Sequence, residues 1–187
     1  MRINLFPILN DFVKEIANNT IEIYNEASIQ FELAIFLRNR LDNSFKIQLE
    51  RNVSFFYSNV KDFLKKEMDI VIFNPDKSIK MCIELKYPRS GQYPEQMFSA
   101  CKDVKFLEQL KESGFTACYF MMFAEDSPFY ISKGGGQIYQ LFRLDKRISG
   151  SIQKPTGKKD KIINIYGEYK INWQSLIGSL KCFTVKI

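Results

Sequence analysis

Histidine is absent from this chain of 187 residues. That absence excludes Ser-His-Asp hydrolases, HNH-type nuclease sites and HExxH metalloproteases, because each of them needs an imidazole as a base or a metal ligand. Any catalysis must therefore depend on carboxylates, lysines, tyrosines or a bound metal ion.

Cysteine is scarce, and no CxxC pair occurs. The four cysteines are Cys82, Cys101, Cys118 and Cys182, and three of them fall inside apolar periodic segments. Zinc sites and disulfide frameworks use closely spaced or paired cysteines, so we expect neither here. We expect buried free thiols instead.

Long apolar runs are also missing. No run approaches the length of a membrane span, and the first residues lack the basic, apolar and small-residue order of a secretory signal. We therefore expect a cytoplasmic protein with no membrane partner. An apolar fraction of 45% with 14% aromatics predicts a packed core, and the length suits one domain over residues 1–187.

The charge is positive, with a formal net value of +6. A basic protein is suited to a polyanionic partner such as nucleic acid, although many basic proteins bind nothing charged.

Three segments carry apolar residues three or four positions apart, which is the spacing of an amphipathic helix. They are residues 5–18, 26–41 and 94–112. Asn25 is the predicted N-cap of the second helix. Pro94 suits the first turn of the third helix, and Gly114 is its natural end.

Strand-like segments lie between these helices and after the last one. The alternating run 45–57 predicts a half-buried strand, and the apolar runs 68–73 and 81–84 predict a hairpin because a Pro/Asn/Asp/Ser cluster joins them. The continuous apolar run 115–123 predicts a strand that is buried on both faces. The order is helix, strand, strand, strand, helix, strand, over a core of about residues 21–124.

The rest of the chain is predicted to be a β-rich extension over about residues 127–187. We predict a strand over 138–144 and a hairpin over 162–173 that turns at Gly167 and Glu168.

Two acids and a lysine are predicted to meet at one end of the central hairpin. Asp69 interrupts an apolar strand, Glu84 ends the neighbouring strand, and Lys86 follows two residues later. Two hard carboxylate ligands suit Mg²⁺, and a lysine beside them can stabilise a charged phosphoryl transition state.

The pattern Asp/Glu-x-Lys also occurs twice elsewhere. Asp103 and Lys105 lie within a predicted helix, where residues two apart do not share a face, so this pair is not expected to form a site. The pair Glu168 and Lys170 has Asp160, in a polar loop, as its nearest upstream acid. Of the three pairs, only the one at Glu84 follows an acid on a paired apolar strand.

Structural explanations for the same residues stay open. Asp69 can be an edge charge or an ion-pair partner of Lys65 or Lys66. Glu84 and Lys86 can form an exposed cross-strand ion pair that contributes little to stability.

The constellation of Asp69, Glu84 and Lys86 on this order of elements resembles the PD-(D/E)xK nuclease superfamily. The resemblance covers about residues 26–124, and Met68 stands where the family name has proline. It implies an α/β fold with a restriction-endonuclease-like αβββαβ core, in which helices flank a mixed central sheet, and here a β-rich C-terminal extension follows.

The resemblance also implies roles for the residues. Asp69, Glu84 and the backbone carbonyl of Leu85 would bind Mg²⁺, with Mn²⁺ as a substitute. Lys86 would activate or orient water and stabilise the phosphate. Members often add an acid from the first core helix, which we match to Glu32, with Glu26 as a competitor; Glu32 can equally be a solvent-facing helix charge.

The implied function is a metal-dependent nuclease, with a DNA endonuclease of restriction, defence or repair type favoured. The alternative is a catalytically inactive nucleic-acid-binding or protein-interaction module on the same fold. Folds of this kind often need two protomers to cut both strands of a duplex, so a homodimer is among the partners that the resemblance implies. The residues expected to contact nucleic acid, each of which can also be a solvated surface residue, are Arg89, Gln96, Lys154, Lys158 and Lys159.

Overall fold

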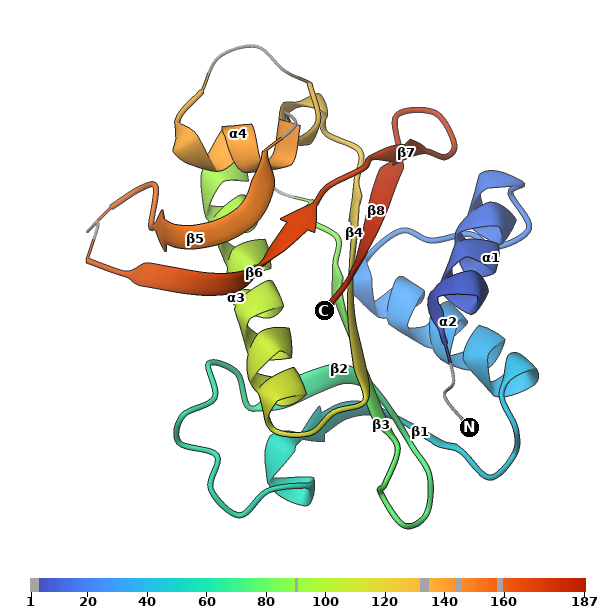
Figure 1. Ribbon diagram of the computed structural model, residues 1–187. Helices are drawn as coiled ribbons and strands as arrows, with labels where there is room; N and C mark the ends of the chain where they lie inside the picture. The colour runs from blue at the N-terminus through green and yellow to red at the C-terminus, as the bar shows by residue number, and fades with distance from the viewer. Residues whose placement is uncertain (1–3, 90, 132–134, 144–145, 158–159) are drawn as a thin grey trace.

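A six-stranded mixed sheet forms the centre of the computed structural model (Figure 1). The structure describes residues 4–89, 91–131, 135–143, 146–157 and 160–187. Within these ranges the fold is α/β, with four α-helices and a separate two-stranded sheet. Each of the described helices is too short or too polar to cross a lipid bilayer.

The central sheet has the order β1-β2-β3-β4-β8-β7. Strand β3 pairs with β4 in parallel, and the other neighbouring strands pair antiparallel. The strands are β1 (Lys46–Asn52), β2 (Glu67–Phe73), β3 (Lys80–Lys86), β4 (Ala117–Ala124), β7 (Gln174–Ser175) and β8 (Lys181–Lys186).

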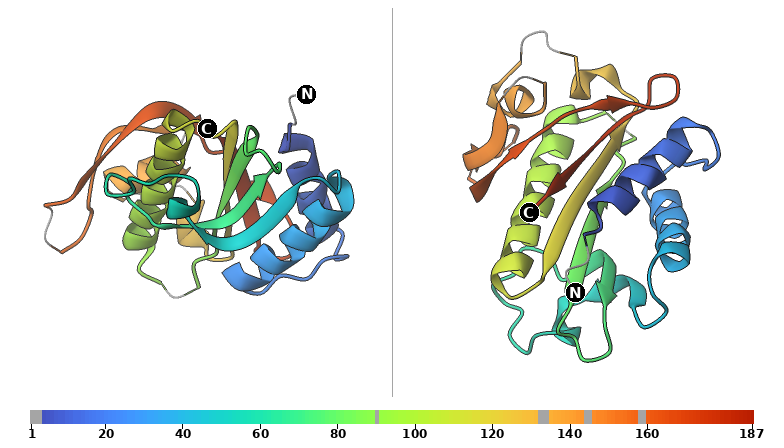
Figure 2. Two further views of the ribbon diagram at one scale, coloured as in Figure 1. Left: turned by 90° about the horizontal axis from the view of Figure 1, so that it is seen from below. Right: turned by 45° about the vertical axis from the view of Figure 1, so that its right-hand side comes forward.

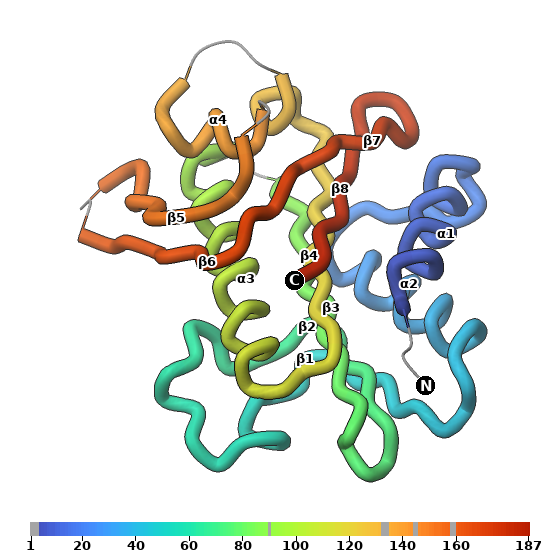
Figure 3. The backbone as a smooth tube through the Cα atoms, viewed as in Figure 1, coloured from blue at the N-terminus to red at the C-terminus, as the bar shows by residue number. Residues whose placement is uncertain are grey.

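Helices cover both faces of this sheet. Helices α1 (Phe6–Ala17) and α2 (Glu26–Arg40) pack on one face, and α3 (Tyr93–Glu112) and α4 (Gln137–Arg143) lie on the other. Figure 2 shows the strands β5 (Arg147–Gln153) and β6 (Ile162–Lys170) outside α3, and Figure 3 shows β6 crossing that helix. Helix α3 is therefore enclosed between the central sheet and the small sheet.

The alternation of side chains along β2 explains how one strand serves two cores. Ile70 and Ile72 pack toward α1 and α2, whereas Val71 and Phe73 pack toward α3. Successive residues of a strand point to opposite faces, so an acid at position 69 belongs to the α3 side. This places the predicted site beneath α3.

The helices predicted from apolar spacing are confirmed as α1, α2 and α3. Asn25 caps α2 as expected, because its Oδ1 accepts a hydrogen bond from the Ser28 amide at 2.7 Å while the Ser28 hydroxyl accepts one from the Asn25 amide at 3.1 Å. Gly114 follows α3 with φ +97°, the left-handed backbone that ends helices. The central hairpin and the fully buried strand β4 are confirmed as well. All four cysteines are buried free thiols, as predicted.

The first predicted strand is too long. Strand β1 ends at Asn52, and Val53–Phe55 form a short 3-10 helix. The Asn52 side chain accepts a hydrogen bond from the Ser54 amide at 2.9 Å, which caps that turn and ends the strand. Leu49 of this strand is 40% exposed although it is apolar.

Two predictions for the C-terminal part are wrong. The predicted strand 138–144 is mostly helix α4, whose Ile138, Leu141 and Phe142 are buried at helical spacing; residue 144 lies outside the described residues. The predicted hairpin is one continuous strand, β6, which pairs with β5. Gly167 does not make a turn; it lies under the Tyr169 hydroxyl, which leaves no space for a side chain.

Candidate functional site

Asp69 and Glu84 lie side by side where the ladder between β2 and β3 ends. The last paired residues are Ile70 and Ile83. Asp69 is the neighbour of Ile70 on β2, and Glu84 is the neighbour of Ile83 on β3, so both acids lie just beyond the last pair. The Asp69 amide donates a hydrogen bond to Glu84 Oε1 at 3.2 Å, and the Leu85 amide donates one to Asp69 Oδ2 at 2.7 Å. The backbone thus fixes both carboxylates at one end of the hairpin, as the sequence predicted.

Helix α3 contributes a third acid, Asp103, whose side chain is 5% exposed. Its Oδ1 lies 3.2 Å from Lys65 Nζ, and its Oδ2 lies 3.3 Å from Lys86 Nζ. We refer to Asp69, Glu84 and Asp103 as the acid cluster.

Sequence reasoning missed Asp103 because it considered this residue only as a pair with Lys105. The side chains of this pair do have different partners: Lys105 Nζ lies 3.1 Å from Glu108, whereas Asp103 contacts Lys65 and Lys86. The sequence did carry a usable signal, because Ala100 and Leu107, three residues before and four after Asp103, are both apolar. An acid within the apolar stripe of a helix is unusual and indicates a buried partner.

The ammonium group of Lys65 occupies the centre of the acid cluster. It lies 3.7 Å from Asp69 Oδ1 and 3.2 Å from Asp103 Oδ1, and it is also paired with Glu84 Oε2. The ion pair between Lys65 and Asp69, considered above as a structural explanation, therefore forms. It is one part of a larger set of contacts.

Lys86 lies next to this group, between α2 and α3. Besides its contact with Asp103, its Nζ is 3.9 Å from Glu26 Oε2, which accepts a hydrogen bond from the Tyr87 amide at 3.1 Å. The acid of α2 that contacts the site is thus Glu26, the competitor. Glu32 is half-buried, and in the described part of the chain no hydrogen bond or ion pair joins its side chain to the acid cluster.

Burial and charge change the protonation of these groups. Burial raises the pKa of Asp69 to about 6, although the Lys65 charge and the Leu85 amide oppose the rise. Burial and the negative charge of Asp69 raise the pKa of Glu84 well above its usual range. Burial lowers the pKa of Lys86, but the charges of Asp103 and Glu26 outweigh it and leave that pKa raised. Lys86 is therefore a stable cation, whereas Asp69 and Glu84 ionise with difficulty.

The donor set suits a hard divalent cation in its chemistry, because carboxylate oxygens are the ligands that Mg²⁺ prefers. Asp103 Oδ2 is buried without a well-directed hydrogen bond, and its contact there is the ion pair with Lys86. Among the described residues, however, no three acid or thiol side chains are already arranged to hold a metal ion. The Lys65 ammonium fills the space between the carboxylates, so a metal would fit after Lys65 moves.

The residues predicted to contact nucleic acid lie in different places. Arg89 is exposed shortly after β3, and its guanidinium is 5.8 Å from the Tyr87 ring centroid. Gln96 and Lys154 line a cavity of about 320 Å³ together with Lys102 and Lys161. Lys158 and Lys159 lie outside the described residues.

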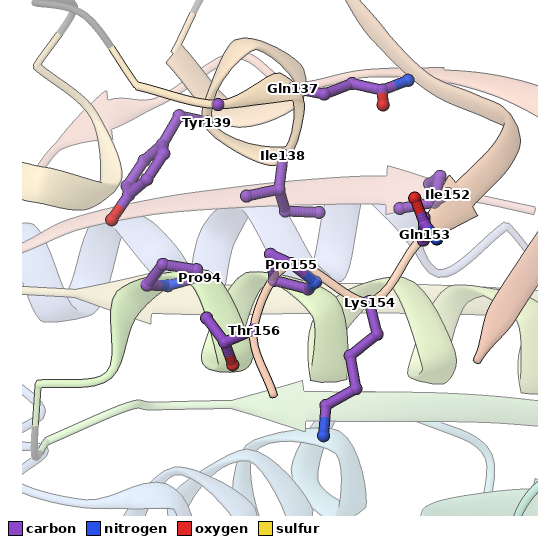
Figure 4. A pocket seen from close by; sticks show the side chains of 10 residues that line it. Pro94, Gln137, Ile138, Tyr139, Ile152, Gln153, Lys154, Pro155 and Thr156 are labelled. Atoms are coloured by element: carbon purple, nitrogen blue, oxygen red, sulfur yellow. The ribbon is translucent and has the colours of Figure 1, made fainter. Parts of the chain in front are cut away.

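A neighbouring cavity of about 270 Å³ lies between the start of α3, α4 and the end of β5. Figure 4 shows Ile138 pointing toward Pro155, with Pro94 at the α3 side. Lys154 lines both cavities and brings a charged side chain to the wall of this one, where Tyr139 also lies. The cavity thus offers a surface for binding, while the acid cluster offers the groups for chemistry.

Comparisons with known proteins give no name for this arrangement: no protein-family model, no curated protein and no solved structure matches the chain.

Proposed function

We propose that this protein is a metal-dependent nuclease that hydrolyses phosphodiester bonds, with DNA as the favoured substrate. The observation that carries the proposal is the convergence of Asp69, Glu84 and Lys86 at one end of the β2–β3 hairpin. The order α2-β1-β2-β3-α3-β4, with β4 parallel to β3, supports the resemblance to the restriction-endonuclease-like fold.

In this proposal, Asp69, Glu84 and the Leu85 carbonyl would hold Mg²⁺ or Mn²⁺, and the ion would supply the activation of water and the neutralisation of charge on the phosphate. Lys86 has a raised pKa and is fixed between Asp103 and Glu26, so it acts as a positive charge rather than as a base. Its role is to stabilise the negative charge that develops on the phosphate oxygens.

A basic surface beside the acid cluster can hold the nucleic acid backbone. Gln96 and Asp103 are seven residues apart on α3, which places them on one face at a separation of about 10 Å. Gln96 borders the cavity that Lys102, Lys154 and Lys161 line, so positive charge lies within a few nucleotides of the acids. Cleavage of both strands of a duplex would require two copies of the site, hence a homodimer.

A second function is favoured by one specific observation. The Lys65 ammonium already contacts each of the three acids, and the Glu84 side chain is 0% exposed. If Lys65 stays there permanently, the protein is a nucleic-acid-binding module that does not cut.

A cleavage assay separates the two functions. The protein is incubated with plasmid, linear and branched DNA and with RNA in Mg²⁺ or Mn²⁺, beside Asp69→Asn, Glu84→Gln and Lys86→Met. We expect each substitution to lower the cleavage rate by at least about 100-fold, since each removes a charge that acts on the transition state.

Glu168→Gln is the matched control, because Glu168 belongs to the other strand-borne Glu-x-Lys pair and its side chain is 66% exposed. Cleavage by the control should equal that of the unsubstituted protein. Nucleic acid that is bound without metal and never cut would favour the binding module.

A further inference from the structure

The position of Lys65 points to a role that the nuclease proposal does not include. Its ammonium group has a carboxylate from β2, one from β3 and one from α3 around it. A single positive charge surrounded by three carboxylates has the environment of a bound cation. We propose that Lys65 is an internal counter-ion that occupies the divalent-cation position, and that Asp103 becomes a third carboxylate around the cation when Lys65 withdraws.

Accessibility supports this exchange. The Lys65 side chain is 30% exposed, whereas the side chains of Asp69, Asp103 and Glu84 are 13%, 5% and 0% exposed. Lys65 is thus the outermost member of the group, and a cation that arrives from solvent meets it before it meets the acids. The acids, in contrast, are fixed by the backbone hydrogen bonds of β2 and β3 and by their place on α3.

Lys65 is also the member of this group whose side chain can move without disturbing a helix or a strand. It lies just before β2, in a stretch after Phe56 that contains neither helix nor strand. Gln109 of α3 holds the backbone of that stretch, because it donates to the Asp62 carbonyl at 2.6 Å and accepts from the Leu64 amide at 2.9 Å. The ammonium ends a flexible four-carbon chain, so it can leave while this backbone stays in place.

The charge balance favours a stronger cation at this place. Four carboxylates, those of the acid cluster and of Glu26, face two ammonium groups, which leaves a formal excess of two negative charges. A divalent ion would neutralise this excess better than Lys65 does. Lys65 and the metal carry like charge and cannot share the position, so Lys65 sets how tightly the metal binds. This inference rests on the proposed function, since it concerns the metal that the nuclease would use.

Metal affinity, measured without any substrate, tests the proposal. Mn²⁺ binding is followed by electron paramagnetic resonance and calorimetry for the unsubstituted protein, Lys65→Gln, Lys65→Arg and Lys66→Gln. We expect Lys65→Gln to bind Mn²⁺ at least about tenfold more tightly, because the competing charge is gone. Lys65→Arg keeps the charge and should show no such gain. Lys66→Gln is the matched control, since Lys66 is adjacent and exposed and its ammonium contacts the Val60 carbonyl.

Asp103 is tested in the Lys65→Gln background. Adding Asp103→Asn should abolish the gain in Mn²⁺ affinity, because the third carboxylate would be lost. If Lys65→Gln binds Mn²⁺ no better than the unsubstituted protein, or if none of these proteins binds it, the proposal is overturned. A double variant that keeps the whole gain would remove Asp103 from the proposal.

The test stays informative if Lys65→Gln fails to fold. Lys65→Gln leaves buried acids without a counter-ion, so its thermal unfolding is recorded with and without Mn²⁺. Folding that Mn²⁺ restores supports the exchange, whereas a variant that stays unfolded in Mn²⁺ overturns it.

Failure of the nuclease proposal is seen separately: tight Mn²⁺ binding without cleavage removes the nuclease and keeps the exchange. Metal-dependent cleavage without a gain in Mn²⁺ affinity in Lys65→Gln removes the exchange and keeps the nuclease.

Discussion

Helix α3 carries two buried acids whose surroundings differ in kind. Glu108 accepts hydrogen bonds from the Tyr166 and Gly167 amides at 2.9 and 2.7 Å and from the Tyr169 hydroxyl at 3.1 Å. Asp103, in contrast, faces two lysine ammonium groups. Glu108 fastens strand β6 to the helix, and Asp103 faces groups that can be exchanged.

The difference shows what distinguishes a structural acid from an acid suited to function. Donors that belong to the backbone of a strand cannot leave without unfolding that strand, so the Tyr166 and Gly167 amides stay with Glu108 even if its ion-pair partner Lys105 moves away. Lysine side chains can leave and return, so the ionisation and the partners of the acid cluster can change. Burial alone does not separate the two cases, since the side chains of Asp103 and Glu108 are both 5% exposed.

The largest expected effect is on stability at Glu108. Glu108→Ala leaves two amides and a hydroxyl without their acceptor, and should lower the free energy of unfolding by about 3 kcal/mol. Asp103→Ala should change it by less than about 1 kcal/mol, because it also relieves repulsion within the acid cluster. Urea unfolding of the metal-free proteins measures both. Equal losses at the two positions would mean that the comparison is wrong.

The next effect is on catalysis, and here the substitution at Asp103 should have a larger effect than the one at Glu108. Asp103→Asn should lower the cleavage rate by about 100-fold, because Lys86 loses the partner that holds its ammonium beside the phosphate. Glu108→Gln should leave the rate unchanged at a temperature well below its unfolding midpoint. Single-turnover cleavage of a labelled DNA fragment gives the two rates, and a comparable loss in Glu108→Gln would contradict a purely structural role.

A smaller effect concerns pH. The pKa of Asp69 is about 6 in the folded protein and ordinarily 3.8, so between these values the folded protein holds a proton that the unfolded chain releases. Stability of the metal-free protein should therefore be highest below the lower value, and it should fall by about 2 kcal/mol between about pH 4 and about pH 6.

Asp69→Asn should reduce that slope, and Glu84, whose pKa is also raised, accounts for the part that remains. Urea unfolding in a chelator at several pH values between about 4 and about 7 measures it. The slope of Glu108→Gln serves as the comparison, since that substitution leaves the acid cluster intact. A slope that is undiminished in Asp69→Asn would assign the proton to another group.

The smallest effect is expected at Gln109, another polar residue of α3, which holds the segment before β2. Gln109→Ala removes its hydrogen bonds to Asp62 and Leu64 and should cost about 1 kcal/mol. Amide exchange should then become faster at Leu64, while Glu112→Ala, at an exposed position of the same helix, leaves it unchanged. Unchanged exchange in Gln109→Ala would show that the segment does not depend on this side chain.

The parts of the site that depend on neighbouring strands could be predicted from the sequence, and the part that depends on packing could not. Alternation and a turn signal placed Asp69 beside Glu84, because antiparallel pairing of adjacent strands is a local property. Asp103 reaches the same place because α3 crosses the sheet, which no spacing in the chain encodes. Lys65 was considered for an ion pair with Asp69, but its contact with three acids depends on the same packing.

The errors in the fold have similar causes. Helix α4 is too short for its period to stand out from a strand of the same length. Gly167 gave a turn signal, yet this position is small because the Tyr169 hydroxyl lies over it and Glu108 binds its amide. Strand β8 was not predicted. It completes the sheet through pairing with a strand far away in the sequence.

That pairing has a consequence during synthesis. Strand β4 is buried along its whole length, and one of its edges is covered by β8, which the ribosome makes much later. Until residues 181–186 emerge, the nascent chain presents an apolar strand with open hydrogen-bonding groups, the kind of edge that recruits chaperones or aggregates.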